Sequence, residues 1–300
     1  MYHLATIFPK LKEIKLPLSR DQLVLVMVAI NEIIVGVDIF LAHSISRTIV
    51  PYEWIPIIFG PIAGILLLIS GAIAIRRREL ATSIATLVFV SSILVGVLGS
   101  YFHIRRAFLL DAGFAQMFSI DLAIWAPPLF GPITFAGLGI YGLSAAFIEA
   151  PAGSGKLKLW GNKTLQMPFS KTRGYLFLVA LGMLAMLGSS VFDHARTGFE
   201  NPWLWLPTVV GIFAVVVAVV LGVADEINEN DVKTYFVAMT LMMLTGLIGT
   251  ALHIQTDLTS DFQFVQERFL RGAPFMAPLN FVNMGMLALI VLLDPKEETE

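Results

Sequence analysis

Eight long apolar runs alternate with polar segments along the chain of 300 residues. Each run is close to the ~20 residues that an α-helix needs to cross a bilayer. The runs cover residues 22–43, 55–75, 83–104, 120–147, 175–195, 203–224, 233–254 and 274–293. The pattern predicts an all-α polytopic membrane protein with eight transmembrane helices.

Residues of the first four runs recur in the last four at a nearly constant spacing. The segment VGVLGSYFHI at 95–104 returns as TGLIGTALHI at 245–254. Further matches pair His43, Pro51, Trp54 and Pro56 with His194, Pro202, Trp205 and Pro207, and Pro128, Pro132, Phe135 and Gly139 with Pro274, Pro278, Phe281 and Gly285. Because each copy has an even number of spans, both enter the membrane in the same orientation. We expect two parallel-repeat four-helix bundles, at residues 1–149 and 174–300, joined by an inner-side linker at 150–173.

Composition and charge agree with a membrane location. The chain is 57% hydrophobic and only 14% charged, which excludes an ordinary soluble domain. Alternating loops place 14 of the 20 Lys and Arg residues on the side of the N-terminus. Both termini are therefore expected to be cytoplasmic, with the protein embedded in the lipid of the inner or plasma membrane. A net charge of −2 predicts no nucleic-acid partner.

Histidine is the first candidate for chemistry, since the chain has no cysteine. Four of the five histidines end the odd-numbered runs, so all four are expected near the outer face: His43, His103, His194 and His253. Any one of them alone is typical of interfacial anchoring. Their recurrence in duplicated register favours a chemical role for the four together.

Glycines precede three of these histidines on the same helical face, one or two turns deeper in the membrane. They are Gly36 before His43, Gly96 and Gly99 before His103, and Gly246 and Gly249 before His253. Missing side chains below an imidazole make room for a flat group such as haem, whose iron accepts imidazole ligands. The alternative is the small-residue pattern that lets transmembrane helices pack closely.

Pairing within each bundle predicts one or two b-type haems. Their iron would be held by His43 with His103 and by His194 with His253. Four arginines follow closely: Arg47, Arg105, Arg106 and Arg196. They would meet haem propionates, or lipid headgroups in the alternative interpretation.

Two acids lie within the first run. Glu32 shares the face of His43 and Gly36 and stands about 16 Å deeper, while Asp38 lies on another stripe with Asn31. An intramembrane carboxyl is a candidate for proton transfer or for facing a quinone. A structural hydrogen bond from Glu32 to a neighbouring helix is the alternative. The second unit has no acid that matches Glu32.

Prolines cluster where the fourth and eighth runs begin, in WAPPLFGPITF and GAPFMAPLNF. Prolines in this pattern break regular backbone, which membranes tolerate where the segment lines a cavity or is buried in protein.

The two-bundle, eight-helix plan with one histidine pair per bundle resembles the architecture of haem A synthases. Those enzymes carry their histidines on even-numbered helices, beside a glutamate–histidine–arginine signature that is absent here, so no catalytic residue is transferred. The segment LGSYFHIRRAF and the two-bundle plan also resemble quinol-binding membrane subunits of polysulfide and dimethyl-sulfoxide reductases.

Three functions remain open from the sequence. The first is a di-haem b-type cytochrome that exchanges electrons with quinol or an outer-side partner. The second is a haem-free, quinone-binding anchor subunit of a larger respiratory oxidoreductase. The third is a metal-binding or transport protein in which the four imidazoles gather an ion.

Overall fold

The computed structural model describes residues 4–14, 16–45, 47–108, 113, 117–161 and 163–293. In this part, six helices are long and apolar enough to cross a membrane. They are α1 (Arg20–Ser44), α2 (Trp54–Ala74), α3 (Arg78–Ala107), α7 (Lys171–Ala195), α8 (Leu206–Val223) and α9 (Glu229–Asp257). Short 3-10 turns, η3 (Pro51–Glu53) and η4 (Pro202–Trp205), lead into α2 and α8. The prediction of an all-α membrane protein is confirmed at this level.

The fourth and eighth apolar runs are not the continuous helices that were predicted. Residues 120–147 divide into α5 (Ile120–Trp125) and α6 (Ile133–Ala146), and α11 covers only Leu279–Val291. Helices α6 and α11 both begin directly after a proline, Pro132 or Pro278. Proline lacks an N–H and clashes with the preceding helical turn, so each helix starts behind it and is shortened.

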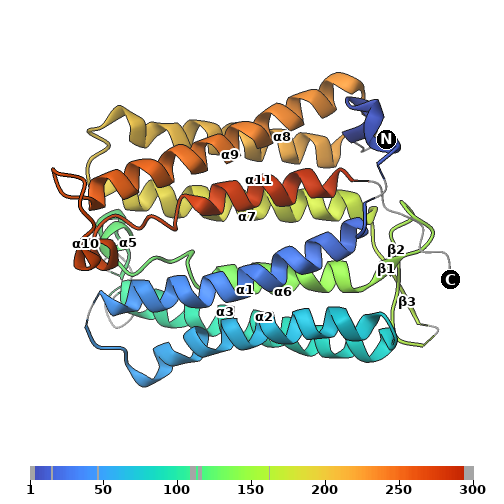
Figure 1. Ribbon diagram of the computed structural model, residues 1–300, viewed down its shortest axis with the longest axis horizontal. Helices are drawn as coiled ribbons and strands as arrows, with labels where there is room; N and C mark the ends of the chain where they lie inside the picture. The colour runs from blue at the N-terminus through green and yellow to red at the C-terminus, as the bar shows by residue number, and fades with distance from the viewer. Residues whose placement is uncertain are drawn as a thin grey trace.

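The helices pack in two sets. The first helix set consists of α1, α2, α3 and α6, in which α2 and α6 each contact both α1 and α3. The second helix set consists of α7, α8, α9 and α11, with α8 and α11 each in contact with both α7 and α9. Figure 1 shows the sets as two layers with roughly parallel helix axes. Contacts of α1 with α11 and of α6 with α7 join them.

The two ends of the molecule differ in structure. One end carries the N-terminal turns η1 (Leu4–Thr6) and η2 (Pro9–Lys12) and an antiparallel sheet of β1 (Ile148–Glu149), β2 (Lys156–Lys158) and β3 (Thr164–Gln166) (Figure 1). The opposite end carries α5 and α10 (Gln266–Arg271). Strands β2 and β3 lie in the segment 150–173 that was expected to be a linker, and β1 directly precedes it. The β2–β3 register pairs Leu157 with Leu165.

Candidate functional site

The four predicted histidines lie in the last two turns of α1, α3, α7 and α9, at the end of the molecule that carries α5 and α10 (Figure 1). We call this the histidine end. All four side chains are partly buried. Each helix set contributes two of them.

His103 and His253 make the same contact in the two sets. His103 Nδ1 lies 2.9 Å from the Pro128 carbonyl oxygen, and His253 Nδ1 lies 3.1 Å from that of Pro274. A carbonyl oxygen only accepts, so Nδ1 carries the proton and donates. In the neutral ring, Nε2 then holds the lone pair.

The proline breaks explain why these carbonyls are available. In a helix, the carbonyl of residue 128 would accept from the N–H of residue 132, and that of residue 274 from residue 278. The residues that should donate, Pro132 and Pro278, are both prolines and have no N–H. In the first set the histidine of the adjacent helix takes the place of the missing donor to Pro128. In the second set the Pro274 carbonyl accepts from both the Ala277 N–H at 3.0 Å and His253, so the histidine uses its second lone pair.

The first helix set adds a second imidazole and a carboxylate. His43 Nδ1 lies 2.9 Å from the Ile39 carbonyl oxygen, so it also donates and leaves Nε2 as the lone-pair nitrogen of the neutral ring. The rings of His43 and His103 are 6.1 Å apart between centroids, at an angle of 61°. Glu53 Oε1 lies 3.9 Å from His43 Nε2. Sequence reasoning missed Glu53, because it lies in the turn before α2 at a position that the repeat does not match.

The second helix set has a related arrangement. His194 Nδ1 lies 3.5 Å from Ser190 Oγ, and His194 interacts electrostatically with His253. Asp193 interacts with His253 and forms an ion pair of 3.6 Å with Arg196. Asp193 and Arg196 also line a pocket of about 10 Å³, close to the volume needed for one water molecule.

The glycine faces below the histidines of the first set are occupied by neighbouring helices. A Cβ built on Gly96 would collide with the Ala136 backbone in α6, and one on Gly99 would lie 2.8 Å from Pro132 Cβ. On α1, a Cβ on Gly36 would lie 2.5 Å from Pro61 Cδ in α2. The space expected above these glycines is therefore filled by protein.

The second set repeats this packing. A Cβ on Gly246 would lie 2.6 Å from the Pro278 carbonyl oxygen and 2.7 Å from Val282 Cγ2, and one on Gly249 would lie 2.9 Å from Pro278 Cβ. Close approach of helix backbones is the usual use of small residues in membranes. The five glycines fit this alternative rather than a surface that a macrocycle could lie against.

The four arginines near the histidines differ in their surroundings. Arg196 donates from Nε to the Ile124 carbonyl at 2.8 Å and from Nη2 to that of Ala126 at 3.0 Å, so it holds the end of α5. Arg47 is 73% exposed and lies 3.8 Å from Glu267. Arg105 and Arg106 are exposed at the end of α3.

Of the two predicted acids, Glu32 is separate from the histidine end, whereas Asp38 lies five residues before His43 on α1. Glu32 is fully buried inside the first helix set, where its Oε1 lies 2.5 Å from Ser92 Oγ of α3. Asp38 is partly buried further along α1. On the face of α1 that carries Asp38, Asn31 and Asn283 of α11 exchange two side-chain hydrogen bonds of 3.0 and 2.8 Å.

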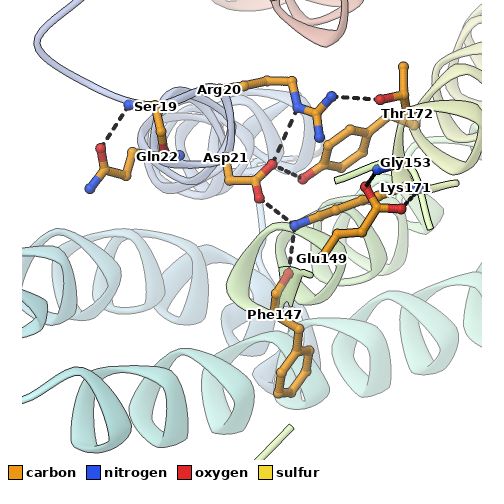
Figure 2. Close-up of polar contacts among 10 residues, drawn as sticks. Ser19, Arg20, Asp21, Gln22, Phe147, Glu149, Gly153, Lys171 and Thr172 are labelled. Atoms are coloured by element: carbon orange, nitrogen blue, oxygen red, sulfur yellow. Dashed lines mark hydrogen bonds and ion pairs between the residues drawn. The ribbon is translucent and has the colours of Figure 1, made fainter. Parts of the chain in front are cut away.

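A polar network that sequence reasoning missed joins the sets at the end opposite the histidines. Figure 2 shows Lys171 Nζ donating to Asp21 Oδ2 at 2.5 Å and to the Phe147 carbonyl at 2.6 Å. The Tyr175 hydroxyl donates to Asp21 Oδ1 at 3.0 Å, and Arg20 Nη1 donates to Thr172 at 2.7 Å.

The repeat offers a signal for this network. Ser19 and Ser170 are the N-caps of α1 and α7, and each precedes a buried cation, Arg20 or Lys171, at the spacing of 151 residues found elsewhere. Extending the repeat to the helix starts would have paired these two cations.

Within the described residues, no three His, Asp or Glu side chains are placed to hold a metal ion together. Comparisons with protein-family models, with curated proteins and with solved structures found no match. The function is therefore inferred from the geometry of the chain itself.

Proposed function

We propose that this protein is a redox component of a membrane that binds a quinol or quinone head group at the histidine end. The observation that carries the proposal is the repeated contact of His103 with Pro128 and of His253 with Pro274. Each contact fixes the ring and leaves Nε2 as a hydrogen-bond acceptor. A quinol hydroxyl is a matching donor.

Oxidation of a quinol to a quinone releases two protons and two electrons. In the first helix set, the Nε2 atoms of His43 and His103 would take one proton each from the two hydroxyls. Glu53, 3.9 Å from His43 Nε2, would stabilise the imidazolium that forms. The electrons would pass to a redox subunit on the outer side, so the chain would work as a membrane subunit of a larger respiratory oxidoreductase.

The proposal includes the membrane topology. α6 and α11 would complete each helix set as its fourth span, giving eight spans in two parallel units at 1–149 and 174–300. The Lys- and Arg-rich end with the sheet would be cytoplasmic, together with both termini, in the inner or plasma membrane. Exposed aromatic residues support an interfacial depth for the histidine end: Tyr52, Trp54, Trp203 and Trp205.

Haem binding is the second candidate, and the ring separation of His43 and His103 favours it. Two imidazoles with centroids 6.1 Å apart are close to the spacing of two axial ligands, and an Nδ1–H bonded to a carbonyl is typical of ligating histidines. The filled glycine faces do not fit a macrocycle lying against them. A haem would have to lie elsewhere around the pair.

Binding of decyl-ubiquinol, or of a short-chain naphthoquinol, to the full-length protein in nanodiscs under anaerobic conditions tests the first candidate. His103→Asn and His253→Asn keep an amide N–H for the proline carbonyl and lose Nε2. Loss of one neutral hydrogen bond should weaken binding about three- to tenfold per site. His3→Asn is the control and should bind like the parent. Unchanged affinity in the double variant, or no binding of either quinol, would contradict the proposal.

A reduced-minus-oxidised absorption spectrum of the purified protein tests the second candidate. A b-type haem would give sharp bands that are lost in His103→Ala and His253→Ala. A colourless protein that still binds the quinol supports the quinol proposal alone.

A further inference from the structure

Glu32 is the most deeply buried acid among the described residues, with no exposed surface. Its carboxyl lies between α1 and α3, where Oε1 is 2.5 Å from Ser92 Oγ. Its second oxygen, Oε2, is buried and has no hydrogen-bond partner among the described residues. Full burial and an unpaired oxygen together determine whether the Glu32 carboxyl holds a proton.

No cation is available to pair with a charge at this position. Helices α2, α6 and α11 pack on α1, and Ser92 brings α3 against Glu32. The facing stretches 54–74, 81–100, 133–146 and 279–291, and residues 21–42 of α1 itself, contain no Lys, Arg or His. An ionised carboxylate here would be a lone buried charge with one oxygen unpaired, which is strongly unfavourable. A neutral acid leaves only a carbonyl oxygen without a partner.

The hydrogen bonds of Ser92 lead to the same result. Ser92 Oγ contacts Glu32 Oε1 and also lies 3.1 Å from the Phe135 carbonyl oxygen in α6. A hydroxyl has one proton, and a carbonyl oxygen can only accept. Both contacts are satisfied together when Ser92 donates to Phe135 and Glu32 supplies a proton of its own to Ser92.

The second helix set provides an internal comparison. The repeat spacings match Glu32, Ser92 and Phe135 with Met183, Met242 and Phe281, and all three of the latter are buried. Two methionines thus fill the place of the acid and the hydroxyl in an otherwise similar packing. The fold of a helix set does not require the polar pair, so its presence in one set alone points to a specific role.

We propose that Glu32 is a proton-binding site inside the first helix set, holding one proton as a neutral carboxylic acid that is linked through Ser92 to α6. The second set has Met183 and Met242 at the matching positions. The proposal does not depend on quinol binding at the histidine end, because the proton is the ligand.

Infrared spectroscopy of the full-length protein at neutral pH tests the proposal. The protein should show a C=O stretching band of a protonated carboxylic acid that moves to lower frequency in D₂O. Glu32→Gln should remove this band, whereas Asp38→Asn should leave it in place. Ser92→Ala should shift it to higher frequency, because the acid loses its hydrogen bond.

The double variant Glu32→Met/Ser92→Met copies the second set and should fold and lack the band, so the test does not depend on the stability of Glu32→Gln. A band that survives both replacements of Glu32, or its absence from the parent protein at neutral pH, would overturn the proposal.

Discussion

At the scale of single residues, the histidine end depends on what each polar group does with a free carbonyl. The carbonyls of Pro128 and Pro274 accept from the histidines, the latter beside its bond from the Ala277 N–H. Arg196 satisfies the carbonyls of Ile124 and Ala126. A helix that ends within a membrane protein needs such partners, because unpaired backbone groups are costly there. Arg196 therefore stabilises the end of α5, and its donors are used there rather than for a haem propionate.

Replacing Arg196 with Met should loosen α5 and the segment that follows it. The variant loses two hydrogen bonds from a charged donor that is 34% exposed, so the local opening free energy should fall by about 1.5 kcal/mol. Hydrogen–deuterium exchange of residues 119–131 measures this loss. Arg47→Met is the control, since its ion pair is mostly exposed and should be worth under about 0.5 kcal/mol. Equal protection in Arg196→Met and the parent would show that the two bonds do not hold the segment.

At the scale of elements, the glycines of α3 and α9 determine how closely α6 and α11 pack. Further along the same contact, a Cβ on Gly139 would lie 2.5 Å from the Phe89 carbonyl oxygen, and one on Gly285 would lie 2.9 Å from that of Met239. Phe89 and Met239 are 150 residues apart, as are Gly96 and Gly246. The helix pairs α3–α6 and α9–α11 are therefore built on the same contact positions.

A bulky side chain at Gly96 should push α6 away from α3. Gly96→Leu places a side chain against the Ala136 backbone, and such overpacking should lower the unfolding free energy by about 1–3 kcal/mol. Unfolding in mixed micelles measures the change. Gly137→Ala is the matched control on α6, because a Cβ there meets nothing within 4 Å and should be neutral or slightly stabilising. A Gly96→Leu protein as stable as the control would mean that the face is open.

The element scale also shows what the sequence could predict. Hydrophobic run length located the six long helices, because the bilayer fixes the length of a span. Run length did not show that 120–147 divides at its prolines, since the break is a local backbone effect. The sequence also did not show whether the glycine faces contact a helix or a ligand, because both uses place glycines at the same helical spacing. Glu53 and the linker sheet depend on tertiary contacts that no periodicity encodes.

At the scale of the whole molecule, polar contacts at two depths join the helix sets. The Asn31–Asn283 pair links α1 to α11, and the network of Asp21, Lys171 and Tyr175 links α1 to α7. Interhelical hydrogen bonds in membranes contribute modestly each, whereas a buried ion pair is expensive to break. The Asp21 network should therefore dominate the stability of the junction.

Replacing Lys171 with Met should separate the sets more than any surface lysine change does. Lys171 is 1% exposed and its Nζ contacts Asp21, which is itself 24% exposed, so the loss should be about 3 kcal/mol, the lower end for broken buried pairs. The double variant Asp21→Asn/Lys171→Met should recover only part of this loss, because Asp21→Asn also removes the counter-ion of the buried Arg20, whose Nε lies 3.5 Å from Asp21 Oδ1. Unfolding free energies in a double-mutant cycle measure both effects. Lys233→Met is the control, since Lys233 forms an exposed ion pair with Glu229 within α9 and should cost under about 0.5 kcal/mol. If Lys171→Met were as mild as Lys233→Met, the junction would have to be held by the apolar contacts of α1 with α11 and of α6 with α7.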